Sequence, residues 1–584
     1  MKDIILQKLL FCPDERLDKN MFYRTEHSNS HCICTKEALL MNGDVWKANT
    51  YFNSFSMQKW MKYTIIKNIF LVLRIKGICE ISVYGTYISH GRLYGRKISH
   101  GTYGNAVKME EVRIAIPAQE RFQSIYFKIC ARGQTCFYGG YYSTDMQMHN
   151  EVKLAVAICT YHRRQYIQQT VMRLEKQVFC NPDSVLKNRL HVFLVDNSGS
   201  NDMKIYETEN IHVFSQREKG SSGGFARGLL ETEKRKEYTH CILMDDDIFL
   251  YTEVLERLYR FLCYIKKQYG AAIIGGGLLR ADLPYLQHEA GAVWNAGMIK
   301  GCKSGYDLRD YKKSVRNEIE EPASYMGWWM CCIPMQVLKK RGYPLPLYFH
   351  KDDIEFGLRN TMQMTLNGIC VWHEPFEAKT DIVNEYYDIR NTGIINALHR
   401  VSHGKRIYMM YLAKRVVVNL FRYKYRAVEL ILKGAEDFLK QPNQIVAMDC
   451  GAFYRRLKKN SYPEYNAGRS YTGRIQTAGR DIPAWMKIIT FNGAIFPGRG
   501  KKAVCAFEPN TDLFWRLKEA YFYNPYTNTY IKTVRSNRQA AKYMLRLVCI
   551  LLQTACSYHK VSLEWRKKFC ELASAEHWWK LLKG

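Results

Sequence analysis

Residues 240–247 read HCILMDDD, an apolar run of strand length that ends in three consecutive aspartates. Three carboxylates that leave a buried strand are electrostatically costly unless a cation compensates them. Asp245 and Asp247 can offer oxygens to one hard cation, and Mg²⁺ or Mn²⁺ accepts a few protein carboxylates together with diphosphate oxygens. The stretch therefore predicts a strand that ends in a divalent-metal site. The alternative is an N-terminal cap for the helix predicted over Thr252–Tyr269, since acidic residues favour helix starts.

The residues around this stretch predict an α/β domain. Further apolar runs of strand length are Val152–Thr160, Arg189–Asp196 and His212–Ser215, and segments with helical spacing lie between them. Continuous apolar strands that alternate with helices are typical of a parallel sheet covered on both faces. Ligands of such sheets bind outside the carboxyl ends of the strands. We expect a Rossmann-like, nucleotide-handling domain over about residues 150–400.

Polar side chains follow the first two of these strands. Thr160-Tyr-His-Arg-Arg closes the first strand, where Tyr161 and Arg163 are candidates for contact with a nucleotide. Asp196 closes the second strand, and its carboxylate can accept a hydrogen bond from uracil N3 or a ribose hydroxyl. An Asx-type turn would explain Asp196 equally well.

A glycine- and serine-rich segment, GSSGGFAR at 220–227, leads into a predicted helix. It lacks the Gly-Lys-Ser/Thr ending of a P-loop and the spacing of a dinucleotide fingerprint. Gly223 and Gly224 would let the backbone approach a diphosphate, and Arg227 would add a positive charge. All three are candidate donor contacts, and a plain flexible loop is the other interpretation.

Three later motifs complete the candidate site. Trp328 and Trp329 are adjacent and either fill a core or form a stacking wall for a sugar acceptor. Asp352 and Asp353 begin a predicted helix. A carboxylate at a helix N-terminus stays ionised and is fixed in position, as a general base must be. Helix capping alone would also explain aspartates at these positions. His373 ends the apolar run GICVW and is a candidate third metal ligand beside the two aspartates.

The flanking regions have different patterns. Residues 1–149 carry short runs rich in Ile, Val, Tyr and Phe between turn residues, as in a β-sandwich or barrel. Residues 401–584 carry helical spacing, and 33 Lys and Arg there face 12 Asp and Glu, an excess of 21 within a net charge of +31. We expect a basic, mainly helical C-terminal domain whose field attracts an anionic membrane surface or a phosphorylated substrate. No secretory leader is expected, and no apolar run reaches the roughly 20 residues that cross a bilayer.

The motifs form a spaced set: Val-Asp-Asn at 195–197, Ser-Ser-Gly-Gly at 221–224, the aspartate triplet, Trp-Trp, DDIEFGLR at 352–359, Trp-His and Asp-Ile-Arg-Asn at 388–391. This order resembles the inverting family-2 glycosyltransferases of the GT-A fold. Within them it is most similar to the bacterial polymerising galactofuranosyltransferases that build cell-wall galactan. The resemblance is strongest over residues 152–400, and TYFNSF at 50–55 extends it into the N-terminal region.

The resemblance implies roles for these residues. It implies metal ligation by Asp245, Asp247 and His373, and a general base at Asp353. It also implies donor contacts that include Arg163, Asp196 and Asp246, and acceptor contacts from Trp328, Trp329 and Asp352. The implied cofactor is Mn²⁺ or Mg²⁺, the implied donor is UDP-galactofuranose, and the implied acceptor is a growing cell-surface glycan or a lipid-linked glycan. A cytoplasmic location, peripheral to the membrane face, comes with the same resemblance.

Two positions depart from the family pattern, and other functions stay open. Glu218 stands where the family often has Asn, and Ala292 stands where an acidic residue is expected near the donor sugar. Another nucleotide sugar, such as a rhamnose or galactopyranose donor, is therefore an alternative. A nucleic-acid-binding protein would explain the charge but not the strand-end carboxylates, and no nucleic-acid-binding motif is recognised, so we expect no nucleic-acid partner. A non-catalytic scaffold would tolerate loss of the base, and a homo-oligomer is compatible with the sequence.

Overall fold

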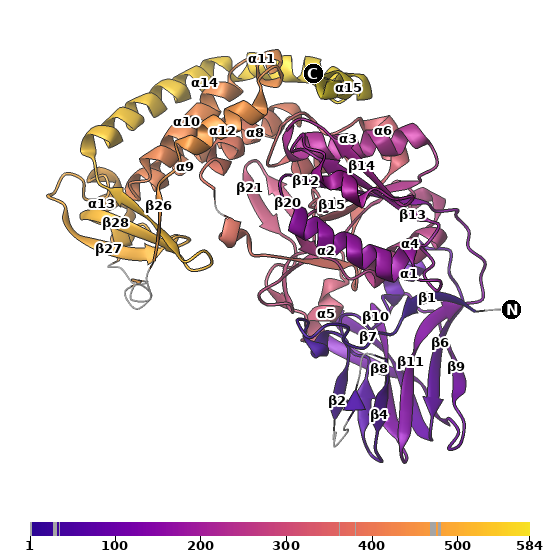
Figure 1. The fold of residues 1–584 in the computed structure, drawn as a ribbon. Coiled ribbons are helices and arrows are strands. Elements are labelled where there is room, and N and C mark those ends of the chain that lie inside the picture. Colours follow the sequence, from indigo (N-terminus) through magenta and orange to yellow (C-terminus); the bar gives the residue numbers. More distant parts are fainter. Residues whose placement is uncertain are drawn as a thin grey trace.

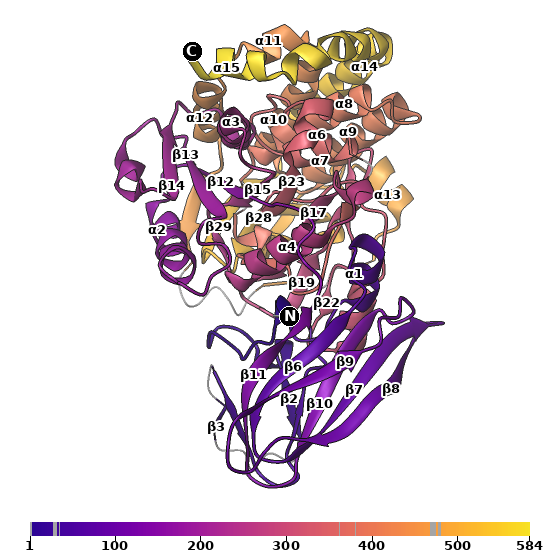
Figure 2. The same cartoon turned by 90° about the vertical axis from the view of Figure 1, so that its right-hand side faces the viewer.

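The computed structural model describes residues 3–26, 32–33, 36–360, 362–379, 381–467, 475–476 and 481–583. Two N-terminal sheets lie at one end of the molecule, an α/β region lies in the middle, and long helices with a small sheet form the other end (Figure 1 and Figure 2). None of the helices in these ranges is long and apolar enough to span a bilayer.

The N-terminal region consists of two sheets in which every strand pair is antiparallel. One has the order β3-β4-β11-β6-β9 with β1 beside β11, and the other has the order β2-β5-β10-β7-β8. Residues of both sheets share one apolar core with the central region. The elements are β1 (Ile4–Lys8), β2 (Arg24–Glu26), β3 (Cys32–Ile33), β4 (Ala38–Leu40), β5 (Val45–Lys47), α1 (Met57–Tyr63), β6 (Ile69–Lys76), β7 (Cys79–Ser89), β8 (Arg92–Tyr103), β9 (Glu110–Ile116), β10 (Ser124–Ala131) and β11 (Thr135–Thr144).

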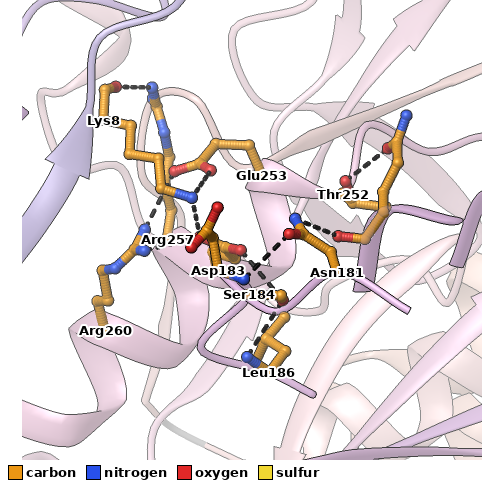
Figure 3. A network of polar contacts seen from close by, with 11 residues as sticks. Lys8, Asn181, Asp183, Ser184, Leu186, Thr252, Glu253, Arg257 and Arg260 are labelled. Atoms are coloured by element: carbon orange, nitrogen blue, oxygen red, sulfur yellow. Dashed lines mark hydrogen bonds and ion pairs between the residues drawn. The ribbon is translucent and has the colours of Figure 1, made fainter. Parts of the chain in front are cut away.

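A buried ion-pair network fixes β1 to the central region (Figure 3). Lys8 Nζ lies 2.5 Å from Glu256 and 3.2 Å from Glu253, and both glutamates also pair with the buried Arg260. Arg257 donates to the backbone carbonyl of Lys8. Because removal of one member would leave the others buried without compensation, the network holds the two regions in one arrangement.

The central region is built on a seven-stranded sheet of order β14-β13-β12-β15-β23-β17-β24. The first four strands are parallel, so their carboxyl ends meet at one edge, as predicted. A second sheet has the order β16-β25-β18-β19-β22. The strands are β12 (Leu154–Thr160), β13 (Leu190–Asp196), β14 (Ile211–Ser215), β15 (His240–Asp245), β16 (Ile248–Phe249), β17 (Ile273–Gly275), β18 (Gly277–Arg280), β19 (Leu286–Glu289), β20 (Ala292–Asn295), β21 (Met298–Gly301), β22 (Tyr306–Asp307), β23 (Met330–Pro334), β24 (Gln363–Met364) and β25 (Cys370–His373).

Helices surround these sheets. The α-helices are α2 (Arg164–Leu174), α3 (Gly220–Arg235), α4 (Glu253–Tyr264), α5 (Tyr311–Asn317), α6 (Met335–Arg341), α7 (Asp352–Leu358) and α8 (Asn384–Leu398). The short helical turns are η1 (Lys19–Met21), η2 (Glu175–Phe179), η3 (Asp202–Tyr206), η4 (Lys267–Tyr269) and η5 (Phe376–Lys379). Thr252 is the N-cap of α4, so the aspartate triplet does not cap that helix and this alternative is wrong.

The C-terminal part combines helices with a four-stranded sheet of order β26-β29-β28-β27. Its elements are α9 (Gly404–Phe421), α10 (Tyr425–Phe438), α11 (Pro442–Val446), α12 (Cys450–Lys459), β26 (Glu464–Asn466), α13 (Ala484–Ile489), β27 (Arg499–Cys505), η7 (Asp512–Phe514), β28 (Leu517–Asn524), β29 (Thr529–Val534), α14 (Asn537–Leu572) and α15 (Ala575–Lys583). The sheet was not predicted, although residues 517–534 have the β-rich composition of a hairpin. The helical spacing of this region is interrupted between α9 and α10, where Tyr423 adopts φ +58°.

Helix α14 runs along the outside of the neighbouring helices, and α15 returns to the central region (Figure 1). Trp578 of α15 is buried in the same apolar cluster as α3 and α6 residues, and its indole N–H donates to the carbonyl of Pro344 at 2.7 Å. The last helix is therefore anchored beside the central sheet rather than on the C-terminal helices alone.

Candidate active site at the carboxyl edge of the central sheet

The three predicted metal ligands meet at this edge. Asp245 ends β15 beside β12, and Asp247 follows two residues later. Ile248 pairs with His373 across β16 and β25, which brings the imidazole next to the aspartates. One ligand atom from each of Asp245, Asp247 and His373 lies within 4.8 Å of the others. Residues that are 126 positions apart in the chain thus converge on one point.

The electrostatics of this cluster are those of a cation site. Burial, and then the neighbouring charge of Asp247, raise the pKa of Asp245 to about 7. Burial alone would also raise the pKa of Asp247, but the hydrogen bond and charge of His373 and the charges of Lys379 and Arg163 outweigh it, so the net shift is downward. Two buried carboxyl groups that lie close together are stabilised by positive charge, which a divalent cation can supply. The donor set of two carboxylates and one imidazole suits Mn²⁺ or Mg²⁺.

Two cationic side chains contact the aspartates. Arg163 donates to Asp246 at 3.0 Å and also to Asp247. Lys379 at the end of η5 donates to Asp247, and its Nζ lies 3.1 Å from Nε2 of His373. Arg163 was predicted at this edge, whereas Lys379 was missed because a lysine six residues after a histidine carries no recognisable signal.

Asp246 points to the first strand rather than to the other two aspartates. It accepts hydrogen bonds from the Thr160 hydroxyl at 2.7 Å and from Arg163, and it is buried. Tyr161, the next residue after Thr160, is exposed beside this group. Asp246 therefore holds Arg163 in place, and Arg163 and Tyr161 are the side chains left to meet a nucleotide.

The Asp352–Asp353 pair begins α7, as predicted. Asp352 is buried and accepts hydrogen bonds from the Ser221 and Ser222 hydroxyls at 2.8 and 3.0 Å. Asp353 is less buried, and its pKa is raised well above the usual carboxyl value by burial, then by the charges of Asp352, Glu289 and Asp245. A carboxyl group whose pKa is raised is suited to accept a proton near neutral pH.

Helix α8 fixes the loop that positions Asp353. Asn391 donates to the backbone carbonyl of His350 at 2.6 Å, and Lys351 lies 2.7 Å from Asp388. His350 and Lys351 both have φ near +70°, a region that L-residues rarely adopt. The strained backbone is held by these α8 contacts, which explains the role of the Asp-Ile-Arg-Asn motif at 388–391.

Asp196 also lies at this edge, and its contacts are compatible both with an Asx-type turn and with a nucleotide contact. Its backbone pairs with Thr160 of β12, and its side chain accepts from the Ser198 N–H at 2.9 Å and the Ser200 hydroxyl at 3.3 Å. These bonds form the Asx-type turn that was the alternative. They leave the buried carboxylate at the strand end where a nucleotide would bind.

The glycine-rich segment is not a loop, which corrects that interpretation. Gly220 starts α3, and Gly223 and Gly224 lie near its N-terminus. A Cβ on Gly224 would come within 2.0 Å of Cys159 Sγ, and one on Gly223 would meet Lys219. Gly224 permits close packing of α3 on Cys159 of β12, which is a different reason from approach to a diphosphate.

Two further predicted contacts are corrected by the packing. Arg227 pairs with Glu231 on the same helix at 2.9 Å and lies over the ring of Trp579, so its guanidinium group is engaged by these two side chains. Trp328 is buried between Phe225 and Phe356, and it is a core residue rather than an acceptor wall.

Trp329 lies closer to the candidate site. Its indole N–H donates to the Gly276 carbonyl at 3.0 Å, and its ring centroid is 6.4 Å from that of Phe376, which in turn lies 5.1 Å from the His373 ring. The buried Trp329 therefore packs near Phe376, the ring that contacts His373.

The two departures from the family pattern have structural counterparts. Glu218 is engaged by the Tyr348 hydroxyl and by Arg455 of α12. Near Ala292, the buried Glu289 has an Oε1 atom without a hydrogen-bond partner among the described residues, and burial raises its pKa to about 7. Glu289 was missed by the sequence analysis, and it supplies a carboxyl group three residues before the position where one was expected.

Models of two protein families match the chain. Residues 6–145 match the N-terminal region of galactofuranosyltransferase 2, and residues 155–281 match glycosyl transferase family 2. The second match contains the strand ends that carry Arg163, Asp196 and the aspartate triplet.

Individual relatives are similar over most of the chain. The galactofuranosyltransferase GlfT2 of Mycolicibacterium smegmatis is 24% identical over 449 residues, which are 71% of this chain and 67% of that protein. The GlfT2 of Mycobacterium tuberculosis is 24% identical over 448 residues, which are 71% of this chain and 68% of that protein. Among solved structures, a mycobacterial protein overlaps with a TM-score of 0.26 at 11% identity, covering 41% of this chain and 73% of that chain.

Proposed function

The chain is a glycosyltransferase of family 2, and we propose that it transfers galactofuranose from UDP-galactofuranose to a growing cell-surface glycan or a lipid-linked acceptor. The observation that carries the proposal is the convergence of Asp245, Asp247 and His373 within 4.8 Å at the strand edge. The similarity to galactofuranosyltransferases supports the choice of sugar. The GT-A arrangement of the central sheet supports a nucleotide-sugar donor.

The proposed reaction is a single displacement. Asp353 takes the proton of an acceptor hydroxyl while that oxygen forms a bond to the anomeric carbon of the donor sugar. The bond from this carbon to the diphosphate oxygen breaks, and UDP leaves with the electron pair. The anomeric configuration is therefore inverted. The raised pKa of Asp353 supports its assignment as the base.

We assign the cofactor as Mn²⁺ or Mg²⁺ held by Asp245, Asp247 and His373. When bound, such an ion neutralises the charge that develops on the leaving diphosphate. His373 donates from Nδ1 to the carbonyl of Glu374, which orients Nε2 toward Asp247. Nε2 is thus the ring nitrogen that lies where a ligand is needed.

Donor and acceptor contacts follow from the placement of the remaining residues. We propose that Arg163, Tyr161 and Asp196 meet the nucleotide, because they share the edge that carries the metal ligands. The acceptor would approach from the side of Asp353. Asp352 is hydrogen-bonded to Ser221 and Ser222 of α3, and it thereby helps to position Asp353. Arg227 and Trp328 are left out of this proposal.

We propose three domains: a β-sandwich at 1–149, a GT-A domain at 150–400, and a basic, mainly helical domain at 401–584 that also carries the small sheet. The two antiparallel N-terminal sheets around one core support the first assignment. The order of the three domains matches the order in which the family models and the basic C-terminal region follow one another.

We also propose that the C-terminal domain binds an anionic membrane surface. Besides the positive charge, α13 and the turn after it expose large apolar side chains, with Trp485, Ile488 and Ile489 at 61%, 70% and 71% exposure. The exposed Lys501 and the half-buried Lys502 follow on β27. An exposed apolar patch next to cations is typical of a surface that enters the headgroup region of a bilayer.

A donor screen tests the proposed function. Purified protein with Mn²⁺ and an oligogalactofuranosyl acceptor is incubated with UDP-galactofuranose, UDP-galactopyranose or a rhamnose nucleotide, and nucleotide release is measured. UDP-galactofuranose should give the fastest release. Because Ala292 lacks the expected carboxyl group, a faster rate with either other donor would replace galactofuranose in the proposal.

A further inference from the structure

Lys379 contacts two of the three candidate metal ligands. Its Nζ donates to Oδ2 of Asp247 and lies 3.1 Å from Nε2 of His373. The lysine ends η5, six residues after His373 in the chain. One ammonium group therefore joins the carboxylate and the imidazole on which a divalent cation would depend.

The hydrogen bonds fix which atoms carry protons. A backbone carbonyl only accepts, so the bond from His373 to the Glu374 carbonyl places a proton on Nδ1. Nε2 lies 3.1 Å from Nζ of Lys379 and 3.2 Å from Oδ1 of Asp247. The ammonium group of Lys379 therefore occupies the side of both ligand residues that an ion would use.

We propose that Lys379 is a tethered cation that competes with the divalent ion for Asp247 and His373, and that binds the donor diphosphate once the ion holds these ligands. This inference rests on the proposed function. The same carboxylate and the same Nε2 cannot serve both cations fully, so ion binding displaces the ammonium group. Its side chain is 27% exposed, whereas that of Asp247 is 5% exposed, so the lysine is the partner with room to turn.

The diphosphate is the anion that fits the displaced lysine. Lysine carries a compact charge on a flexible stem, which suits contact with phosphate oxygens. Arg163 already approaches the same Asp247 oxygen from the β12 side. The two cations would then flank the leaving group, and Lys379 would stabilise its negative charge.

The first test measures Mn²⁺ binding without nucleotide, by calorimetry. Lys379→Met should bind Mn²⁺ about tenfold more tightly than the wild type, the size expected for one lost charge-assisted hydrogen bond. Lys379→Arg keeps the positive charge and should bind like the wild type. Lys433→Met is a matched control, since Lys433 is 31% exposed and also pairs with a buried aspartate, Asp437, on α10.

The second test measures UDP binding at saturating Mn²⁺. Lys379→Met should bind UDP about tenfold more weakly, so the same substitution moves the two affinities in opposite directions. Unchanged or weaker Mn²⁺ binding in this variant would overturn the inference, and so would wild-type affinity for UDP. A wild-type protein that binds no Mn²⁺ would instead refute the metal site of the proposed function, and the competition with it.

Discussion

Nε2 of His373 lies 3.2 Å from Oδ1 of Asp247, which is in the turn between β15 of the seven-stranded sheet and β16 of the five-stranded sheet. The pairing of Ile248 with His373 creates this contact, because β16 directly follows the aspartates and is hydrogen-bonded to β25. A metal site at this point joins the seven-stranded sheet to the five-stranded sheet.

Removal of the imidazole should weaken the metal site selectively. His373→Ala should lower Mn²⁺ affinity by more than the roughly 10–100-fold seen for residues that only support a ligand. The fold should persist, because Arg163 and Lys379 still compensate Asp247. Calorimetric titration with Mn²⁺, with a melting curve as control, checks this. A variant with unchanged affinity would exclude His373 as a ligand.

The base assignment is tested by two adjacent substitutions. Asp353→Asn keeps the shape of the side chain but loses its basicity, so kcat should fall by at least about 10²-fold while UDP and Mn²⁺ still bind. Asp352→Asn should lower kcat less, because Asp352 is hydrogen-bonded to Ser221 and Ser222. If Asp352→Asn were inactive and Asp353→Asn were active, the register of the assignment would be wrong by one residue.

The pH dependence of kcat follows from the raised pKa of Asp353. Burial, and then the charge of Asp352, favour the protonated carboxyl group. A protonated carboxyl cannot accept the acceptor's proton, so kcat should rise with pH through an apparent pKa above the ordinary carboxyl value of about 4 and then level off. The apparent value belongs to the coupled pair of aspartates. A kcat that falls as pH rises from about 5 to 7 would contradict this assignment.

Binding to vesicles should depend on both the α13 patch and salt. Ile488→Ser should weaken cosedimentation with anionic phospholipid vesicles, because an apolar side chain that is 70% exposed loses its contact with the bilayer. Salt should weaken binding of both proteins, since exposed charges are screened beyond about 8–10 Å.

Ile205→Ser is the matched control for this patch. Ile205 is 62% exposed on η3 of the central region. Its substitution should leave vesicle binding unchanged. Equal losses in Ile205→Ser and Ile488→Ser would show that general apolar exposure, and not α13, accounts for binding.

Much of the central fold could be predicted from the sequence because strand ends carry strong local signals. The run HCILMDDD predicted β15 and its carboxylates, and parallel pairing then brought Asp196 and Arg163 to the same edge. His373 was found as a strand-end residue. These residues share a simple rule: a buried strand, followed by a polar side chain.

Other features depend on packing that no local pattern encodes. Trp328 and Arg227 have residue types common in binding sites, yet neighbouring aromatic rings place one in a core and the other against α15. Lys379 reaches Asp247 only because η5 turns back after β25. The hairpin of β28 and β29 was hidden in a region whose helices have the stronger periodicity.

The most direct measurement follows the product of transfer. The protein is incubated with UDP-galactofuranose, an oligogalactofuranosyl acceptor and Mn²⁺, and the new linkage is analysed by nuclear magnetic resonance. The account predicts a galactofuranosyl product of inverted anomeric configuration, formed with Mn²⁺, lost in EDTA and lost in Asp353→Asn. A product with retained configuration, or undiminished transfer in EDTA, would contradict it.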